Sequence, residues 1–281
     1  MPSPFLLHTQ VQGAGYPVLC LHGHPGSSDS MMVFTQHLAT RFQAIAPDLR
    51  GYGQSQTTQP FEMADHLADL EALLDRLTIE RCLVLGWSLG GILAMELALK
   101  FPERISGLIL VATAAYPRGN HPSVGWQTYL LTGVAALINW AYPGLQWNID
   151  WFGRRSLFRY LIQQHTPQTY RYISQHAVKA YLQTSSYANK ALNTALRQRY
   201  NRLAELSQIQ SPCLVLAGAE DVHITAASSL ETASAIANCE SHCYANVAHL
   251  LPWEITQQLL QDIDHWLAAH PEATRPTANA S

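Results

Sequence analysis

A serine between two glycines is the strongest chemical signal in this sequence. Ser88 lies in the run G-W-S-L-G at residues 86–90, directly after the apolar residues 82–85 and directly before a long apolar segment. A G-x-S-x-G run between a buried strand and a helix is typical of a serine held in a sharp, strained turn. The glycines are needed because larger side chains would keep the helix from packing close to the strand. The pattern therefore predicts that Ser88 is a nucleophile raised above the edge of a sheet.

A serine hydroxyl needs a base and an orienting acid before it can attack a carbonyl at neutral pH. His249 is the best candidate base among the 13 histidines, because it lies in a loop between the last strand-like segment and the closing helix. Asp221 follows the buried run 213–217 and is the best candidate acid, with the adjacent Glu220 as its rival. The order serine, aspartate, histidine along the chain goes with this kind of turn. We therefore expect a catalytic triad of Ser88, Asp221 and His249.

A glycine- and proline-rich loop follows another buried run. Residues 18–21 lead into H-G-H-P-G at residues 22–26. Acyl transfer by a serine needs backbone N–H groups that point at the developing oxyanion, and a loop of small residues beside the nucleophile can supply one. We assign two such donors, the backbone N–H groups of His24 and Leu89. The imidazole of His22 is expected to brace the loop.

Short, wholly apolar runs recur along the chain with helical patterns between them. The runs are residues 18–21, 82–85, 108–112 and 213–217, with the weaker run 44–47. They lack polar alternation, as is typical of parallel strands that are buried on both faces. Residues 64–77 read as a helix with a leucine stripe, and residues 89–101 as a helix that is apolar nearly all round. The alternation predicts an α/β fold with a mostly parallel central sheet and flanking helices.

The alternation of strands and helices breaks between about residues 117 and 205. This insert reads as several helices, holds four of the seven tryptophans, and has no charged residue from 119 to 149. Prolines, glycines and amides interrupt it, so that no run of about 20 apolar residues could span a membrane. We expect a helical cap, inserted before the acid-bearing strand, over an α/β core formed by residues 1–116 and 206–270. Residues 271–281 are expected to form a flexible tail.

Composition excludes several classes of protein. The 48% hydrophobic residues are ample for a large core, which excludes intrinsic disorder over most of the chain. Lys and Arg total 17 against 20 Asp and Glu, so no basic excess favours a nucleic-acid partner. Five cysteines, an odd number, do not make a disulfide framework. The N-terminus shows no basic and apolar secretion signal, and a cytoplasmic location is therefore expected.

Two further clusters have plain structural interpretations. Cys239, His242 and Cys243 could indicate zinc, but no second Cys or His pair stands at a ligand spacing. We therefore expect no metal site and interpret this segment as the last strand. Four basic residues between 190 and 202 alternate with leucines, which favours the solvated face of an amphipathic helix over an anion site.

These residues resemble the α/β-hydrolase family over essentially the whole chain outside the insert. Residues 22–26 look like its oxyanion loop, and D-L-R-G-Y-G-Q-S at residues 48–55 is similar to its D-x-R-G-x-G-x-S turn. The G-W-S-L-G run matches the family's nucleophile elbow, the run G-A-E-D that ends at Asp221 its acid loop, and His249 its histidine loop. Ala248 is a departure, since glycine often precedes the histidine. The resemblance implies an α/β-hydrolase fold, and the serine excludes haloalkane dehalogenases and epoxide hydrolases, which carry aspartate at the elbow.

The triad and its loops predict a cofactor-free serine hydrolase that works through an acyl-enzyme. The expected substrate is a small carboxylic ester with a hydrophobic acyl or alcohol group, because the insert is apolar and esters are the easiest bonds for this machinery to cleave. Trp87 and Trp253 are candidate walls of the substrate pocket.

Alternatives stay open at this point. The same triad could cleave a carbon–carbon bond or act as a perhydrolase. A receptor-like or binding protein on a hydrolase fold would suit the apolar insert equally well. The insert could also make peripheral contact with lipid, although no integral membrane span is expected.

Overall fold

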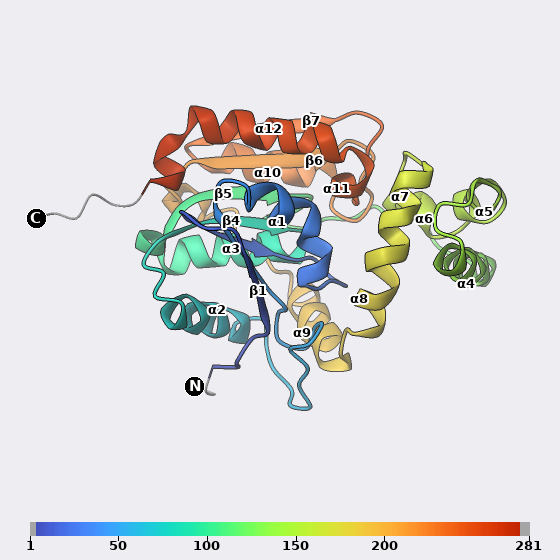
Figure 1. Ribbon diagram of the computed structural model, residues 1–281, viewed down its shortest axis with the longest axis horizontal. Helices are drawn as coiled ribbons and strands as arrows, with labels where there is room; N and C mark the ends of the chain where they lie inside the picture. Colours follow the sequence, from blue (N-terminus) through green and yellow to red (C-terminus); the bar gives the residue numbers. More distant parts are fainter. Residues whose placement is uncertain (1–3, 276–281) are drawn as a thin grey trace, which may run out of the picture.

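A seven-stranded sheet organises residues 4–275, the part of the chain that the computed structural model describes (Figure 1). The strands lie in the order β1-β3-β2-β4-β5-β6-β7, with β1 antiparallel to β3 and every other neighbouring pair parallel. They are β1 (Thr9–Gln12), β2 (Pro17–Leu21), β3 (Gln43–Pro47), β4 (Cys82–Trp87), β5 (Ile105–Val111), β6 (Cys213–Gly218) and β7 (Cys239–Tyr244). The predicted α/β fold with a mostly parallel sheet is confirmed.

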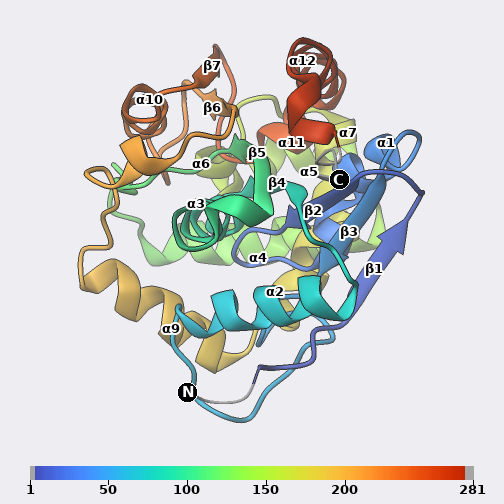
Figure 2. The ribbon, with the colours of Figure 1, turned by 90° about the vertical axis from the view of Figure 1, so that its left-hand side faces the viewer.

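Helices cover both faces of this sheet (Figure 2). One face carries α1 (Met32–Leu38) and α12 (Thr256–Ala269), and the other carries α2 (Asp65–Arg76), α3 (Leu89–Lys100) and α10 (Ala226–Ala235). Helices α2 and α3 match the two predicted helices to within one residue at each end. Such a two-sided cover is what buried parallel strands require.

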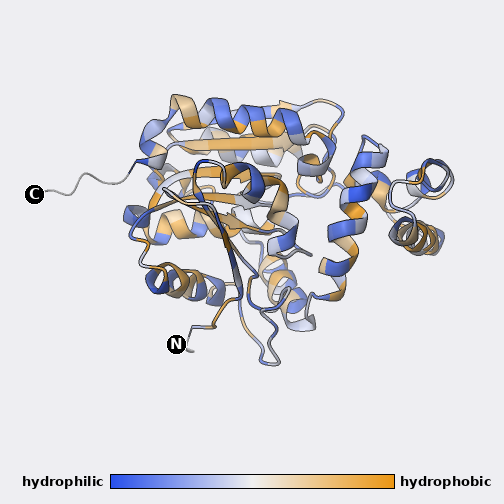
Figure 3. Ribbon diagram, in the orientation of Figure 1, coloured by the Kyte–Doolittle hydropathy of each residue, from blue (hydrophilic) through white to orange (hydrophobic). Residues whose placement is uncertain are grey.

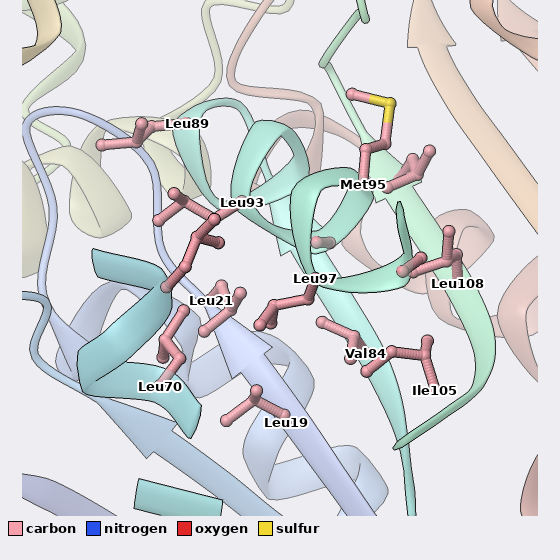
Figure 4. Packing of buried hydrophobic residues seen from close by; sticks show 14 of the residues in the cluster. Leu19, Leu21, Leu70, Val84, Leu89, Leu93, Met95, Leu97, Ile105 and Leu108 are labelled. Carbon is pink, nitrogen blue, oxygen red and sulfur yellow. The ribbon is translucent and has the colours of Figure 1, made fainter. Parts of the chain in front are cut away.

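The strands contribute to two hydrophobic cores at once. In β2, Val18 and Cys20 belong to the core that contains residues of α1 and α12, whereas Leu19 and Leu21 belong to the core that contains residues of α2 and α3. Figure 4 shows the core that contains residues of α2 and α3, with Leu97 of α3 packed over the strands. Because successive side chains of a strand point to opposite faces, a sheet that is covered twice needs apolar residues at every position. This requirement explains the unbroken apolar runs in the sequence.

Helices fill the chain between β5 and β6. They are α4 (Trp126–Ala141), α5 (Gln146–Trp151), α6 (Phe158–Leu161), α7 (Pro167–Tyr172), α8 (Val178–Leu182) and α9 (Ser186–Arg197). A π-helical turn, Ile173–Ala177, joins α7 to α8, and the two continue as one rod beside the body of the molecule (Figure 1). The division of the chain into core and cap stays a prediction, although the helical nature of the insert is as expected.

The predicted tail begins too early. Pro271–Thr274 form a short 3-10 helix, and Ala273 is fully buried. The carbonyl oxygen of Ala273 accepts a hydrogen bond from Ser106 Oγ at 2.7 Å. The composition of this segment did not indicate that it packs on the sheet, because a single small side chain, that of Ala273, is enough to fill the space beside Gly107. The remainder of the predicted tail, residues 276–281, lies outside the described residues.

The basic cluster of the insert also differs from its prediction. Helix α9 ends at Arg197, and Arg199 has a φ of 58°. Beyond this turn Arg202 leaves the helix, donates its backbone N–H to the carbonyl of Ala115 at 2.9 Å, and places its Nε 2.7 Å from Glu96 Oε1. The chain must reverse here to return to the sheet. The residues therefore do not form one solvated helical face.

Candidate active site

Ser88 forms the turn between β4 and α3. Its backbone has φ 53° and ψ −113°, a left-handed φ that residues with side chains rarely adopt. A Cβ on Gly90 would lie 2.0 Å from the carbonyl oxygen of Leu21, and a Cβ on Gly86 would lie 2.3 Å from the carbonyl oxygen of Gly90. Side chains at either position would push α3 away from the sheet. The two glycines therefore keep the helix close and lift Ser88 above the carboxyl end of β4.

Three side chains from separate strand ends meet at this turn. His249 Nε2 lies 3.2 Å from Ser88 Oγ, and His249 Nδ1 lies 2.7 Å from Asp221 Oδ2. Ser88 follows β4, Asp221 follows β6 and His249 follows β7, all at the carboxyl edge of the sheet. Because Nδ1–H donates to the carboxylate, Nε2 is the unprotonated nitrogen and accepts the hydrogen bond from the Ser88 hydroxyl. The structure thus brings together the three residues that the sequence singled out.

The carboxylate of Asp221 is buried and held by several hydrogen bonds. Its Oδ1 accepts the backbone N–H groups of His223 at 2.7 Å and Ile224 at 3.0 Å. Burial by itself would raise the pKa of Asp221, but the charge of His249 and the hydrogen bonds outweigh it, so that the pKa is lowered. Glu220, the rival acid, is exposed to solvent. The acid that bonds to His249 is Asp221, in its ionised form.

The loop after β2 passes directly beside Ser88. A Cβ on Gly23 would lie 3.2 Å from Ser88 Cβ, so the loop leaves almost no space there. The next backbone N–H is that of His24, and the N–H of Leu89 is the first of α3. Within residues 4–275, neither N–H donates to a backbone acceptor. Free donors and the positive end of a helix favour a negative charge beside Ser88. Their role as oxyanion donors stays a prediction.

Buried polar side chains hold this loop in place. His22 Nε2 accepts the N–H of Leu49 at 3.1 Å, which leaves Nδ1–H to donate to the carbonyl of Gly23 at 2.8 Å. Burial lowers the pKa of His22 to about 4, and the ring is therefore neutral near pH 7. Asp48 Oδ1 accepts the backbone N–H of Ser28 at 2.6 Å. His22 braces the loop as the sequence predicted, and the aspartate of the D-x-R-G-x-G-x-S turn braces its far end.

Trp87 and Trp253, the predicted pocket walls, lie buried beside the histidine loop. Their rings meet edge to face, with centroids 5.2 Å apart. Trp87 Nε1 donates to the carbonyl oxygen of His249 at 3.4 Å. This contact ties the backbone of His249 to the last residue of β4, immediately before Ser88. A role of the two tryptophans in a substrate pocket stays a prediction.

Glu254 holds the histidine loop, and sequence reasoning missed it. Its Oε1 accepts the N–H of Ala248 at 2.8 Å, while its Oε2 accepts the N–H groups of Gln163 and Gln164 at 2.6 and 2.7 Å. Burial raises the pKa of Glu254, against the effect of these hydrogen bonds. One carboxylate therefore ties the residue before His249 to the insert. No local signal could have revealed this, because two of the partners lie in a distant part of the chain.

Two further histidines stand next to the proposed base. The ring of His223 lies 5.1 Å from that of His249 between centroids, and His223 Nδ1 lies 2.6 Å from His121 Nε2. Burial, together with the charges of His249 and His121, lowers the pKa of His223 to about 3. Burial also lowers the pKa of His121. Both rings stay neutral near pH 7 and place no positive charge beside His249. In the sequence, the position of His223 two residues after Asp221 was the signal that could have placed it near this site.

A groove of about 940 Å³ lies elsewhere, between the start of α2, the outer side of α3, and α9. Its lining mixes acids such as Glu62 and Glu96 with bases such as Lys100 and Lys190. None of the candidate site residues lines it. The mixed charges favour no single ligand class, and the groove is separate from Ser88, Asp221 and His249.

The fold and the site together define a class of protein. A parallel sheet with helices on both faces, a serine at a strained strand–helix turn, and an acid and a histidine at neighbouring strand ends form the architecture of the α/β hydrolases. The model of the family described as alpha/beta hydrolase fold matches residues 16–254. The chain belongs to this family.

Several of its relatives are named as esterases. Over 126 residues the chain is 34% identical to the pimeloyl-[acyl-carrier protein] methyl ester esterase of Vibrio campbellii. This alignment covers 45% of this chain and 48% of that protein. It is 38% identical over 104 residues to an uncharacterized protein of Mycobacterium tuberculosis, covering 37% of this chain and 30% of that one. The structure of a thermophilic esterase from Thermogutta terrifontis is similar with a TM-score of 0.69 and 25% identity, over 96% of this chain and 94% of that chain. The chain spans about a third to a half of the length of the curated relatives it matches.

Proposed function

We propose that the chain is a serine hydrolase in which Ser88 is the nucleophile, His249 the base and Asp221 the acid that orients the base. The observation that carries this proposal is the unbroken hydrogen-bonded line from Asp221 through His249 to Ser88 Oγ. The strained backbone of Ser88 adds to it, because such strain at a polar residue is typical of functional sites.

The proposed reaction starts with attack of Ser88 Oγ on a carbonyl carbon. His249 Nε2 takes the hydroxyl proton, and the ionised Asp221 stabilises the imidazolium that forms. The backbone N–H groups of His24 and Leu89 bind the oxyanion. When the tetrahedral intermediate collapses, the imidazolium returns its proton to the leaving oxygen and an acyl-enzyme remains. Water, deprotonated by His249, then releases the acid and restores the serine.

The proposed substrate is a carboxylic ester with a hydrophobic acyl or alcohol group. Support comes from the esterase names of two relatives and from the uncharged run at residues 119–149 of the insert. We place the insert, residues 117–205, as a cap next to this site, because the N–H of Leu250 donates to the carbonyl of Leu161 at 3.0 Å, directly after the proposed base. All five cysteines are free thiols, in keeping with a reducing, cytoplasmic compartment.

Labelling with a fluorophosphonate tests the proposal directly. The wild-type protein should be labelled and should hydrolyse p-nitrophenyl esters, with a maximum at one acyl-chain length that gives the size of the pocket. Ser88→Ala should lose the label and about 10⁶-fold in kcat, because the triad acts as a unit. Ser234→Ala, which changes an exposed serine of α10, should behave as the wild type.

Two results would count against the proposal. Labelling that persists in folded Ser88→Ala would move the nucleophile to another serine. A folded wild-type protein that neither reacts with the probe nor hydrolyses any ester, but binds hydrophobic ligands, would favour a binding protein on the same fold.

A further inference from the structure

Helix α4 turns its apolar face to solvent. The large hydrophobic residues Trp126, Leu130, Leu137 and Trp140 are spaced i, i+4, i+11 and i+14, which places them on one stripe of the helix. They are 59–72% exposed. Gly133, at i+7 on the same stripe, has open space where a Cβ would stand. A continuous hydrophobic stripe therefore runs the length of the helix, and no element within residues 4–275 covers it.

The opposite side of α4 is the one that packs on the protein, and it is small and polar. Its buried residues are Thr128, Ala135 and Asn139. Asn139 donates to the carbonyl of Tyr170 at 2.7 Å and accepts the N–H of Gly144 at 2.9 Å. A surface helix of a water-surrounded protein has the reverse arrangement, with apolar residues inward and polar residues outward. The inversion indicates that the outer stripe meets something other than water.

The exposed apolar surface continues from α4 onto α5. Further exposed large hydrophobic residues are Tyr129, Tyr142, Leu145, Trp147 and Trp151. Together with the stripe of α4 we call these residues the α4–α5 face. Both helices stand at the edge of the molecule, farther from the sheet than α7 and α8 (Figure 1), and hydropathy colouring marks hydrophobic stretches along α4 (Figure 3). Six of the nine residues are Trp or Tyr, the side chains that concentrate at membrane–water interfaces.

Basic side chains lie beside this face. Residues 119–182 contain five basic side chains, of which Lys179 pairs with Asp29 outside the insert, and only one acid, Asp150, in a chain whose net charge is −3. Asp150 is already engaged, with its Oδ1 3.4 Å from Arg154 Nε. The guanidinium of Arg155 lies 5.7 Å from the ring centroid of Trp151. The side chain of Arg171 packs beside Gly144, and Gly144 lies between Tyr142 and Leu145 in the chain. The charge next to the face is therefore complementary to an anionic surface.

We propose that the α4–α5 face docks the protein on the surface of an anionic lipid bilayer, with α4 lying in the plane of the interface. An apolar stripe with Trp and Leu and a basic surround is the pattern by which a helix enters the headgroup region without crossing it. Within residues 4–275 no helix combines the length and hydropathy needed to span a bilayer. This docking goes beyond the proposed hydrolase activity and does not depend on it.

A second copy of the chain suits this face less well. A two-fold contact joins the same patch of both partners. In such a dimer, Arg155 and Arg171 of both copies would lie in one interface and repel each other. Asp150 does not offset this repulsion, because it is already paired with Arg154. The repulsion is relieved on a bilayer that carries negative headgroups.

Sedimentation with sucrose-loaded vesicles tests the docking without any turnover. The protein should bind vesicles of phosphatidylcholine mixed with phosphatidylglycerol. The triple variant Trp126→Ser, Leu137→Ser, Trp140→Ser should bind at least about tenfold more weakly, since each change removes a large side chain from the lipid contact. The matched control Leu6→Ser, Leu230→Ser, which changes exposed leucines outside the insert, should bind as the wild type.

A charge variant separates the electrostatic part of the binding from the hydrophobic part. Arg155→Gln with Arg171→Gln should weaken binding to the anionic vesicles and make it less sensitive to salt, whereas Arg197→Gln on α9 should not. The proposal is overturned if wild type and triple variant bind equally, or if neither sediments. It is also overturned if the wild type is a stable dimer that the triple variant breaks into monomers, because a second copy would then cover the face. Each measurement can be repeated on Ser88→Ala, so that a failure of docking and a failure of catalysis are told apart.

Discussion

Ser88, His249 and Asp221 are held by groups that the proposed reaction itself does not use. The φ of 53° at Ser88 is kept by glycines that admit no Cβ, and the Asp221 carboxylate is oriented by the N–H groups of His223 and Ile224. The neighbouring Glu220 points to solvent and lacks this support. At the scale of single residues, orientation and not residue type decides which of two adjacent acids can bond to the proposed base.

Replacing each acid by its amide measures this difference. Asp221→Asn should lower kcat by about 10⁴-fold, because the amide no longer holds His249 in the tautomer that accepts the serine proton. Glu220→Gln should leave kcat within a factor of two or so, since surface changes of this kind are nearly neutral. Steady-state hydrolysis of the best p-nitrophenyl ester, on variants shown to be folded by circular dichroism, gives both values. A large loss in Glu220→Gln with little loss in Asp221→Asn would reverse the assignment of the acid.

Helices α3 and α4 use glycine for opposite reasons. In α3, a Cβ on Gly91 would lie 2.3 Å from Thr113 Cγ2, so the missing side chain lets the helix approach the sheet behind Ser88. In α4, Gly133 faces open space and only lowers the intrinsic stability of the helix. The same residue type is thus required in the element that carries the proposed nucleophile and is dispensable in the element that carries the apolar stripe.

The two glycines predict opposite changes in stability when each is replaced by alanine. Gly91→Ala should lower the free energy of unfolding by about 1–3 kcal/mol through overpacking. Gly133→Ala should raise it by up to about 1 kcal/mol, because alanine is the better helix former and meets no atom. Urea denaturation followed by tryptophan fluorescence compares the two. Equal effects of the same sign would mean that α3 can shift away from the sheet without cost.

Buried neutral histidines make the whole molecule sensitive to acid. His66 is 1% exposed, and burial, with smaller effects of the charges on His22 and Arg50, lowers its pKa to about 3. Its ring packs edge to face on Phe61, with centroids 5.1 Å apart. Because the pKa of His66 is lower in the folded state than in the unfolded state, the unfolded state binds more protons between about pH 6.5 and pH 3. The free energy of unfolding therefore falls as the pH drops through this window.

The size of the effect follows from linkage. Each such histidine lowers the free energy of unfolding by about 1.4 kcal/mol per pH unit within the window, or about 2 kcal/mol between pH 6.5 and pH 5. The variant His66→Leu should lose that part of the pH dependence, as measured by urea denaturation at pH 7 and pH 5. The control Phe61→Leu, which alters the packing around the ring without removing a titrating group, should lower stability equally at both pH values. An unchanged pH dependence in His66→Leu would show that the ring has the same pKa in the folded and unfolded states.

The elements differ in how well local sequence predicted them. Strands β2, β4, β5 and β6 were predicted because burial on both faces demands apolar residues throughout. Strand β1, with the sequence T-Q-V-Q, was not, because its place comes from backbone pairing with β3 at the sheet edge and its side chains stay partly exposed. The insert was predicted to be helical, but the direction of the apolar stripe of α4 was not, since periodicity shows that a stripe exists and not which way it faces.

By itself, the sequence determined the class of fold, the turn at Ser88, and the candidates Asp221 and His249, because each depends on residues close together in the chain. Only the tertiary structure decided which groups surround them. Glu254 reaches Gln163 across 91 positions, and His121 meets His223 across 102. Such contacts arise from the meeting of strand ends and the return of the insert over them. Local propensity carries no record of contacts at that range, and only the folded chain establishes them.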